Sequence, residues 1–213
     1  MVTPPAKAGT KDPLPIRSLD FLGGMAAVGG WRPPGGVPEI AFSGRSNVGK
    51  SSLLNKLVRR KSFARVSRTP GRTQEINFFS VNKAFLLVDL PGYGYAKVSK
   101  EKKGEWGILI EGYLRNSPDL RGVVQLLDAR HPPTDQDMAL LELLAELGIP
   151  TLVAVTKIDK LASKERAARL QALAGLCGVE EDQMIPCSGV TGEGRDDLAA
   201  SLAALLAPPS DPE

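Results

Sequence analysis

Apolar residues gather in short blocks along this chain, and the blocks predict strands that alternate with helices. Mostly apolar runs bounded by polar turns lie at residues 38–44, 84–90, 122–129, 150–157 and 183–188. Such runs are typical of strands that are buried on both faces of a parallel sheet. One more strand is predicted at residues 74–81, joined to the next by a turn at Asn82-Lys83.

The segments between these runs carry apolar residues at helical spacing. Residues 50–60 place their leucines and a valine on one helix face. The same spacing predicts further helices at residues 102–117, 134–148, 163–178 and 195–207. Thr134 suits an N-cap and Gly148 suits a helix end. The alternation predicts an α/β fold in three layers, with a mostly parallel sheet of about six strands flanked by helices.

The two ends of the chain lack this periodicity. Residues 1–20 and 207–213 are rich in proline, so we expect mobile tails around a single domain at residues 21–206. No apolar run approaches the roughly 20 residues that span a bilayer, and the N-terminus has no apolar signal core. We therefore expect a cytoplasmic protein that uses no membrane. Cys177 and Cys187 have no CxxC partner, which favours reduced thiols over a disulfide or metal site.

The net charge of +3 hides an asymmetry between the two halves. Residues 1–106 carry 18 Lys and Arg against 7 Asp and Glu, whereas residues 107–213 carry 9 against 17. The halves are therefore +11 and −8. This polarity favours a polyanionic partner that faces the first half, although a well-solvated surface accounts for it equally well.

The stretch "GRSNVGKS", from Gly44 to Ser51, fits the pattern G-x-x-x-x-G-K-[ST] and lies between a predicted strand and a predicted helix. In that setting backbone amides of the loop can cradle a β-phosphate at the helix N-terminus. Lys50 can neutralise the β and γ oxygens, and the Ser51 hydroxyl can bind Mg²⁺. The pattern predicts a phosphate-binding loop rather than a structural glycine turn.

Two further motifs follow predicted strands at the expected places. "DLPG" begins with Asp89, which can hold Mg²⁺ through water, and ends with Gly92, whose N–H can meet a γ-phosphate. "TKID" ends with Asp159, whose two oxygens can accept the N1–H and 2-amino protons of guanine, while the stem of Lys157 lies along the base. Because adenine lacks this pair of donors, Asp159 favours GTP over ATP.

A weaker fourth motif, "PCSG", follows the last predicted strand. It can bring Ser188 and backbone amides to the guanine O6. The alternative for each motif is an exposed polar turn, and the four in this order make that alternative the minor one. The sequence thus predicts a three-layer P-loop GTPase, or G domain.

Five stretches narrow the comparison to one family. They read "FSGRSNVGKSSLLN", "RTPGRTQEINFF", "DLPGYGYA", "DARHPPTDQD" and "TKIDK". From about Phe21 to Leu205 the chain resembles the EngB (YihA/YsxC) family of bacterial ribosome-assembly GTPases, among the TrmE-Era-EngA-EngB-septin-like proteins. The resemblance implies a compact G domain that binds GTP and GDP and acts on the large ribosomal subunit or its precursor, and we expect a monomer. It also implies a link to cell division and septation.

The resemblance extends the expected site to the first switch segment. It implies that Thr73 completes the Mg²⁺ shell opposite Ser51, a choice over Thr69 that chemistry alone leaves open. Thr156 stands where most GTPases carry asparagine, and Cys187 and Gly189 flank Ser188 in place of commoner residues. The expected nucleotide-binding residues are Gly44, Arg45, Ser46, Asn47, Val48, Gly49, Lys50, Ser51, Ser52, Gly71, Arg72, Thr73, Gln74, Glu75, Asp89, Leu90, Pro91, Gly92, Thr156, Lys157, Ile158, Asp159, Cys187, Ser188 and Gly189.

Tyr93 occupies the position directly after D-x-x-G, where many GTPases place a glutamine that orients the attacking water. A phenol lacks the amide that such a role needs, so we expect slow intrinsic hydrolysis. Lys50 is the expected catalytic residue. Asn47 is a candidate ligand for K⁺, which would supply charge beside the phosphates as an arginine finger does.

The basic excess concentrates in and beside the expected switches. Residues 59–72 hold six Lys and Arg and no acid, and Lys97, Lys100, Lys102 and Lys103 follow "DLPG". We hypothesise that GTP arranges these cations for contact with the ribosomal RNA backbone. The alternatives are contact with the nucleotide itself or solvation of a loop.

Three functions stay under consideration: a GTP-hydrolysing switch, a nucleotide-controlled binding module in division for which hydrolysis is incidental, and a P-loop kinase or ATPase. "TKID" disfavours the third. The lone His131 lies outside the phosphate motifs and favours a structural or partner-contact role over a catalytic base. Trp31 and Trp106 are interpreted as packing residues.

Overall fold

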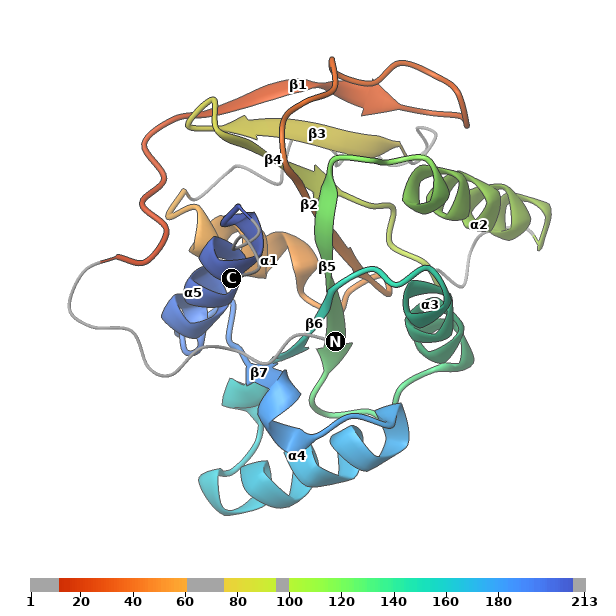
Figure 1. The fold of residues 1–213 in the computed structure, drawn as a ribbon. Helices are drawn as coiled ribbons and strands as arrows, with labels where there is room; N and C mark the ends of the chain where they lie inside the picture. The colour runs from red at the N-terminus through yellow and green to blue at the C-terminus, as the bar shows by residue number, and fades with distance from the viewer. Residues whose placement is uncertain (1–11, 61–74, 95–99, 209–213) are drawn as a thin grey trace, which may run out of the picture.

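The fold is a single sheet covered by helices on both faces. A computed structural model describes residues 12–60, 75–94 and 100–208 of the chain (Figure 1). The strands are β1 (Leu19–Met25), β2 (Glu39–Gly44), β3 (Ile76–Val81), β4 (Phe85–Asp89), β5 (Leu120–Asp128), β6 (Thr151–Thr156) and β7 (Met184–Pro186). They lie in the order β1-β3-β4-β2-β5-β6-β7. The pairs β1–β3 and β3–β4 are antiparallel, and the other pairs are parallel.

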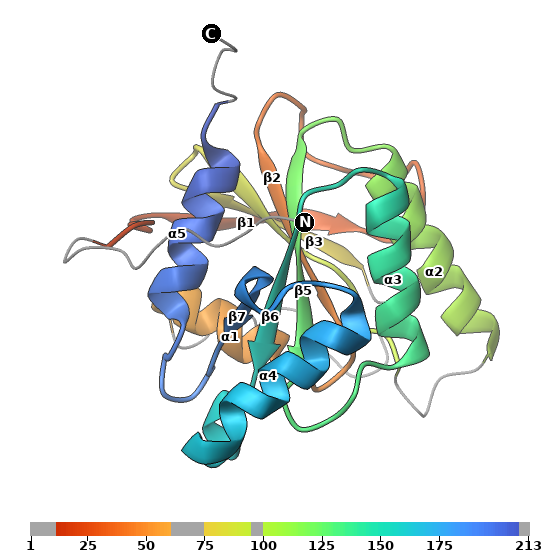
Figure 2. The ribbon, with the colours of Figure 1, turned by 60° about the horizontal axis from the view of Figure 1, so that its bottom comes forward.

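Helices cover both faces of this sheet and make the three predicted layers. They are α1 (Lys50–Leu57), α2 (Lys100–Arg115), α3 (Asp135–Glu146), α4 (Ser163–Cys177) and α5 (Arg195–Leu206), with short 3-10 turns η2 (Ile158–Lys160) and η3 (Glu181–Gln183). Figure 2 shows α1 and α5 on one side of the sheet and α2 and α3 on the other. Alternate strand residues serve the two layers: Ile40 and Phe42 join the core under α1 and α5, whereas Ala41 joins the core under α2 and α3.

The sheet has seven strands rather than the expected six or so, because β1 was not predicted. This edge strand contains two glycines and an aspartate and exposes three consecutive residues, so it lacks the continuous apolar run that marks the inner strands. It begins at Leu19, inside the segment expected to be a mobile tail. The described part of that segment also contacts the domain, since Leu14 joins the core and Asp12 pairs with Arg195 at 2.5 Å. Residues 1–11 and 209–213 of the expected tails lie outside the described residues.

The predicted hairpin turn joins β3 to β4. Asn82 and Lys83 have φ angles of 53° and 56°, which suit a tight turn between antiparallel strands. The Asn82 side chain also accepts hydrogen bonds from the backbone N–H groups of Arg17 (2.8 Å) and Ser18 (3.1 Å). The turn therefore holds the segment that leads into β1.

The predicted ends of α3 are confirmed. Thr134 caps the helix, and its own N–H donates to the carboxylate of Asp137 at 2.8 Å, which completes a capping box. Gly148 follows the last turn with a φ of 64°. Within the described ranges, no helix is both long and apolar enough to cross a membrane.

Candidate nucleotide-binding site

The parallel strands bring all four motifs to one edge of the sheet. The chain leaves β2 into the P-loop, β4 into "DLPG", β6 into "TKID" and β7 into "PCSG". Since β4, β2, β5, β6 and β7 run parallel, their carboxyl ends share this edge, where open α/β sheets bind ligands. The topology thus unites segments that lie far apart in the sequence.

The P-loop turns tightly before α1. Gly49 precedes the helix with a φ of 111°, a backbone conformation that L side chains rarely adopt, and Asn47 has a φ of 66°. Val48 is buried between them, whereas the Asn47 side chain is exposed. The P-loop therefore leads from the carboxyl end of β2 directly to the N-terminus of α1, and a helix N-terminus suits an anion.

Lys50 and Asp89, predicted from separate motifs, are in direct contact. The Lys50 ammonium forms an ion pair with the Asp89 carboxylate and donates to the Leu90 carbonyl at 2.7 Å. Both side chains are largely buried. The pair places the cation of the first predicted phosphate motif against the anion of the second, so these two residues lie at one place on the sheet edge.

The "DLPG" turn is bonded to the P-loop by its backbone. The Ser46 N–H donates to the Tyr93 carbonyl at 2.7 Å, and the Ser46 hydroxyl donates to the Gly92 carbonyl at 3.2 Å. Arg45 and Tyr93 also form an isolated parallel bridge. In this arrangement the Ser46 amide holds the second motif in place rather than facing a phosphate.

Thr156, which replaces the asparagine of most GTPases, contacts the P-loop from the other side. Its hydroxyl lies 2.6 Å from the Val48 carbonyl and 3.0 Å from the Leu127 carbonyl. The side chain is buried at the end of β6. Threonine thus ties the base-binding strand to the phosphate loop with a single short side chain.

Lys157 lies across the P-loop. It has a φ of 60°, and its ammonium donates to the Asn47 carbonyl at 2.5 Å and to the Asp128 carboxylate at 2.9 Å. The stem of the side chain therefore spans from η2 to the P-loop.

Asp159 and Ser188, from the third and fourth motifs, are hydrogen-bonded. The Ser188 hydroxyl donates to Asp159 at 2.6 Å and accepts from the N–H groups of Val190 (3.1 Å) and Thr191 (3.0 Å). The bond from Ser188 lowers the pKa of Asp159, a direction that keeps this carboxylate ionised. An ionised carboxylate is the acceptor that the donor edge of guanine needs.

Gly189 lies where the loop after β7 packs closely against α1, so only glycine fits there. A Cβ at this position would lie 2.7 Å from the Ser52 Cβ and 3.0 Å from the Ser52 backbone carbon. Any larger residue would push the loop away from α1. The flanking Cys187 is buried, and burial raises the pKa of its thiol; Cys177 is also free and buried.

Asp128 was not predicted as a site residue. It ends β5 at the same edge, is buried, and pairs with Lys157 and with the exposed Arg130 at 2.9 Å each. Burial alone would raise the pKa of Asp128, but the bonds from Arg130 and Lys157 outweigh it and hold that pKa well below its usual value. The signal that could have found it is an aspartate at the end of an apolar run, as in the other two strand motifs.

Several predicted residues lie outside the described part of the chain. These are Gly71, Arg72, Thr73 and Gln74 of the first switch segment and most of the basic clusters. Glu75 is described and directly precedes β3. His131 is exposed and its N–H donates to the Asp128 carbonyl, while Trp31 is half exposed and packs edge-on against Phe78.

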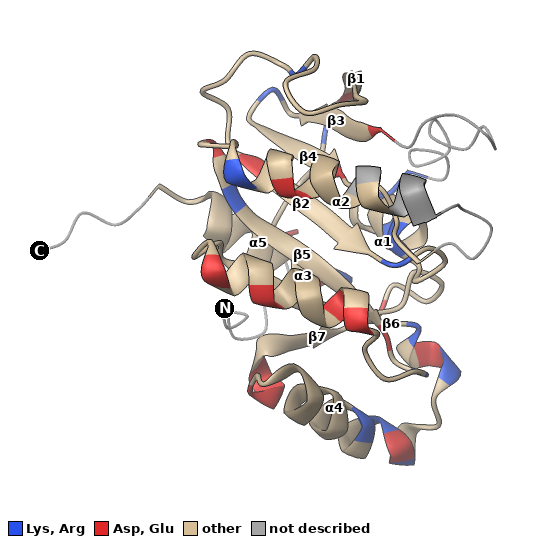
Figure 3. Ribbon diagram, turned by 90° about the vertical axis from the view of Figure 1, so that its right-hand side faces the viewer, with Lys and Arg blue, Asp and Glu red and all other residues tan. Residues whose placement is uncertain are grey.

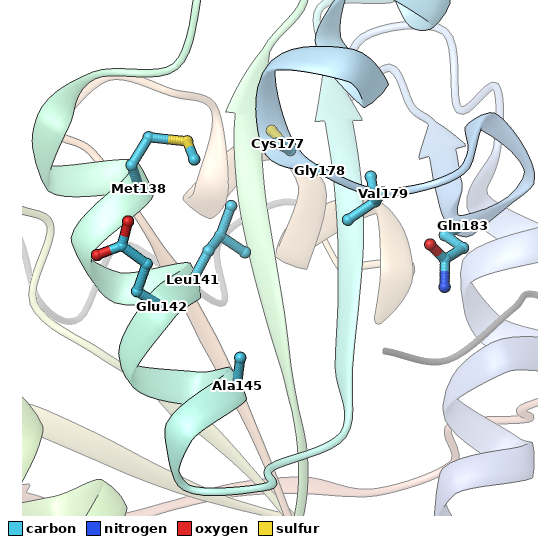
Figure 4. A pocket seen from close by; sticks show the side chains of 8 residues that line it. All are labelled: Met138, Leu141, Glu142, Ala145, Cys177, Gly178, Val179 and Gln183. Carbon is cyan, nitrogen blue, oxygen red and sulfur yellow. The ribbon is translucent and has the colours of Figure 1, made fainter.

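A separate hollow lies between α3 and the end of α4 (Figure 4). It has a volume of about 360 Å³ and is lined by Met138, Leu141, Glu142, Ala145, Cys177, Gly178, Val179 and Gln183. None of the four motifs contributes to it. Its mostly apolar lining does not suit a triphosphate.

Comparison with known proteins agrees with this geometry. A family described as "50S ribosome-binding GTPase" matches residues 39–157, more than half of the chain. The probable GTP-binding protein EngB of Gemmatimonas aurantiaca is 62% identical over 194 residues, which cover 91% of this chain and 95% of that protein. The chain belongs to the EngB family of GTP-binding proteins. The EngB relative from Syntrophotalea carbinolica is 44% identical over 92% of this chain and 94% of its own length.

Solved structures show the same EngB fold. The crystal structure of a probable GTP-binding protein EngB has a TM-score of 0.68 and 28% identity, and the match covers 79% of this chain and 98% of that one. Era of Aquifex aeolicus bound to GDP and AlF4⁻ shares the fold with a TM-score of 0.62 and 23% identity, over 82% of this chain and 58% of that one. The predicted P-loop GTPase fold and the EngB resemblance are confirmed.

Proposed function

We propose that this EngB protein is a GTP-dependent switch with slow intrinsic hydrolysis that acts in assembly of the large ribosomal subunit. The observation that carries the proposal is the convergence of the Lys50–Asp89 pair and the Asp159–Ser188 pair on one sheet edge. The first pair suits phosphates and Mg²⁺, and the second suits guanine. Cell division and septation would then depend on the protein through ribosome supply.

The binding roles follow from the geometry. Lys50 would exchange Asp89 for the β and γ oxygens, and Asp159 would accept the guanine protons while Lys157 flanks the base. Ser51, in the first turn of α1, and Asp89 offer the oxygen ligands that Mg²⁺ prefers, with Thr73 as the third proposed group. Within the described ranges no three His, Cys, Asp or Glu residues gather to hold a metal, so phosphate oxygens would supply the rest of the shell. Mg²⁺ neutralises charge that develops on the transferred phosphoryl group.

Slow hydrolysis follows from where Tyr93 points. Its ring is buried in the core and its hydroxyl donates to Asp137, so it does not reach a water beside the γ-phosphate. Asn47 is exposed on the P-loop, where its side chain can ligate K⁺. We expect faster turnover in KCl than in NaCl at equal ionic strength, measured as phosphate release. Equal rates, with and without ribosomal particles, would remove K⁺ from the proposal.

The ribosomal partner is supported by charge and by the description of the matching family, "50S ribosome-binding GTPase". The acids of the second half include all four charged residues of α3 (Figure 3), whereas the basic excess lies in the first half of the sequence. Contacts of cations with an RNA backbone weaken steeply as salt rises. We expect cosedimentation with large-subunit particles in a non-hydrolysable GTP analogue at low salt, and loss of it in GDP or at high salt.

The second candidate is a nucleotide-controlled division module for which hydrolysis is incidental. The two functions differ in how ribosomal particles affect turnover. Stimulated GTP hydrolysis on addition of large-subunit particles supports the switch. Unchanged hydrolysis, together with binding that ignores the nucleotide, supports the module.

A further inference from the structure

Tyr93 connects the second phosphate motif to α3 through its side chain. The ring is only 8% exposed and packs with the core under α2 and α3. Its hydroxyl donates to Asp137 at 2.6 Å and accepts from the Gln125 amide of β5. Burial, followed by the Asp137 carboxylate, raises the pKa of this phenol far above its usual value, so it stays a hydrogen-bond donor.

Asp137 is itself held firmly by the start of α3. Its second carboxylate oxygen accepts from both the N–H (2.8 Å) and the hydroxyl (2.7 Å) of Thr134. The residue occupies the third position of the helix, where the helix dipole favours a negative charge. The anchor for the Tyr93 hydroxyl is therefore a rigid helix end rather than a mobile side chain.

The backbone of Tyr93 is also hydrogen-bonded to the P-loop. Its carbonyl accepts from the Ser46 N–H, and Gly92 lies against Ser46. Gln125 is also paired in register with Ser43, the residue just before the P-loop begins. Tyr93, which directly follows Gly92, thus links α3 and the central strand β5 to the residue whose N–H is the expected γ-phosphate contact.

We propose that Tyr93 is a positioning residue that holds the Gly92 peptide at the height where its N–H meets a γ-phosphate. The proposal rests on the proposed function, because it names a determinant of GTP over GDP in that same site. A nucleoside triphosphate uses the Gly92 amide and a diphosphate does not. Loosening the anchor should therefore weaken triphosphate binding selectively.

The test compares Tyr93→Phe with Tyr113→Phe. Tyr113 of α2 is equally buried, at 2% exposure, and its hydroxyl donates to the Glu39 carboxylate at 2.8 Å. Glu39 begins β2, at the end of the strand away from the P-loop. Both variants lose a buried phenol–carboxylate hydrogen bond, and Tyr93→Phe also loses the bond from Gln125. Only Tyr93 is bonded through its backbone to the P-loop.

The readout is the ratio of dissociation constants for GDP and for a non-hydrolysable GTP analogue with Mg²⁺. In Tyr93→Phe we expect the analogue to bind roughly tenfold more weakly, with GDP binding changed far less. In Tyr113→Phe the ratio should match the wild type. A folded Tyr93→Phe protein with an unchanged ratio would overturn the inference. Wild-type protein that fails to bind either nucleotide would instead overturn the proposed function.

Discussion

The guanine side and the phosphate side of the site differ in how they are held. On the guanine side, Asp159, Ser188 and Lys157 are fixed by hydrogen bonds within the sheet edge and its loops. On the phosphate side, Lys50 is bound to Asp89, the partner that it would leave for a nucleotide. The adjoining first switch segment lies outside the described residues. In the proposed site, base recognition would therefore be preformed, whereas phosphate binding would require Lys50 to exchange Asp89 for the phosphates.

This difference would let the proposed switch keep a guanine nucleotide bound while it changes between its GTP and GDP states. A preformed base pocket binds GTP and GDP alike, because both carry the same guanine. A phosphate site built on exchangeable pairs responds to the γ-phosphate. Substitutions on the guanine side should lower affinity for both nucleotides equally, whereas Tyr93→Phe should separate them.

The largest expected effect comes from Asp159→Asn. An amide in place of the carboxylate presents an N–H to the guanine protons, so GTP and GDP should each bind roughly 100-fold more weakly. Xanthosine nucleotides, which replace the 2-amino group by a carbonyl, should gain affinity. Isothermal titration with all four nucleotides measures this. The exposed Asp182→Asn is the control, and unchanged GTP affinity in Asp159→Asn would refute the guanine assignment.

Gly189→Ala should rank next. Its new Cβ would meet Ser52 at 2.7 Å, so the loop must shift, at a cost of about 2–3 kcal/mol in free energy of unfolding. Both nucleotides should bind more weakly, since Ser188 moves with the loop. The control is Gly175→Ala on α4, where a Cβ meets no atom within 4 Å and alanine favours the helix. Equal unfolding midpoints for the two variants would contradict the close approach.

Asp128→Asn tests the buried anion that holds Lys157. Loss of its charged hydrogen bonds should cost about 1.5 kcal/mol in free energy of unfolding at pH 7. Because the folded pKa of Asp128 is lowered, its contribution is complete above the unfolded value, about 3.9, and is lost as the pH falls through the folded pKa. Urea unfolding should show the gap between wild type and variant shrinking below pH 4. A gap that does not depend on pH would show that Asp128 acts by shape alone.

The smallest effect should come from Thr156→Val, which removes the tie between the two sides. Loss of one neutral hydrogen bond should cost about 1 kcal/mol in nucleotide binding, roughly a fivefold change. Thr151→Val is the matched control, since that buried hydroxyl donates to the Ile149 carbonyl at the other end of β6. If both variants bind nucleotide alike, the tie has no role in the site.

Much of the fold and of the site could be predicted from local patterns. Continuous apolar runs encode buried strands, helical spacing encodes the covering helices, and a strand followed by G-x-x-x-x-G-K-S encodes the P-loop. The cap at Thr134 and the turn at Asn82 are equally local, because they depend on neighbouring backbone groups. These features need only interactions between residues close in the chain.

The tertiary structure alone revealed the roles of Tyr93, Asp128, Gly189 and β1. Tyr93 is far in sequence from Asp137, and Gly189 is far from Ser52, yet each pair is in contact through the sheet topology. The strand β1 is recognisable only by its pairing with β3, since its own pattern is neither apolar nor alternating. Local sequence shows which side chains carry suitable chemistry. Which of them meet depends on how distant segments pack, and packing placed Tyr93 in the core rather than beside the phosphates.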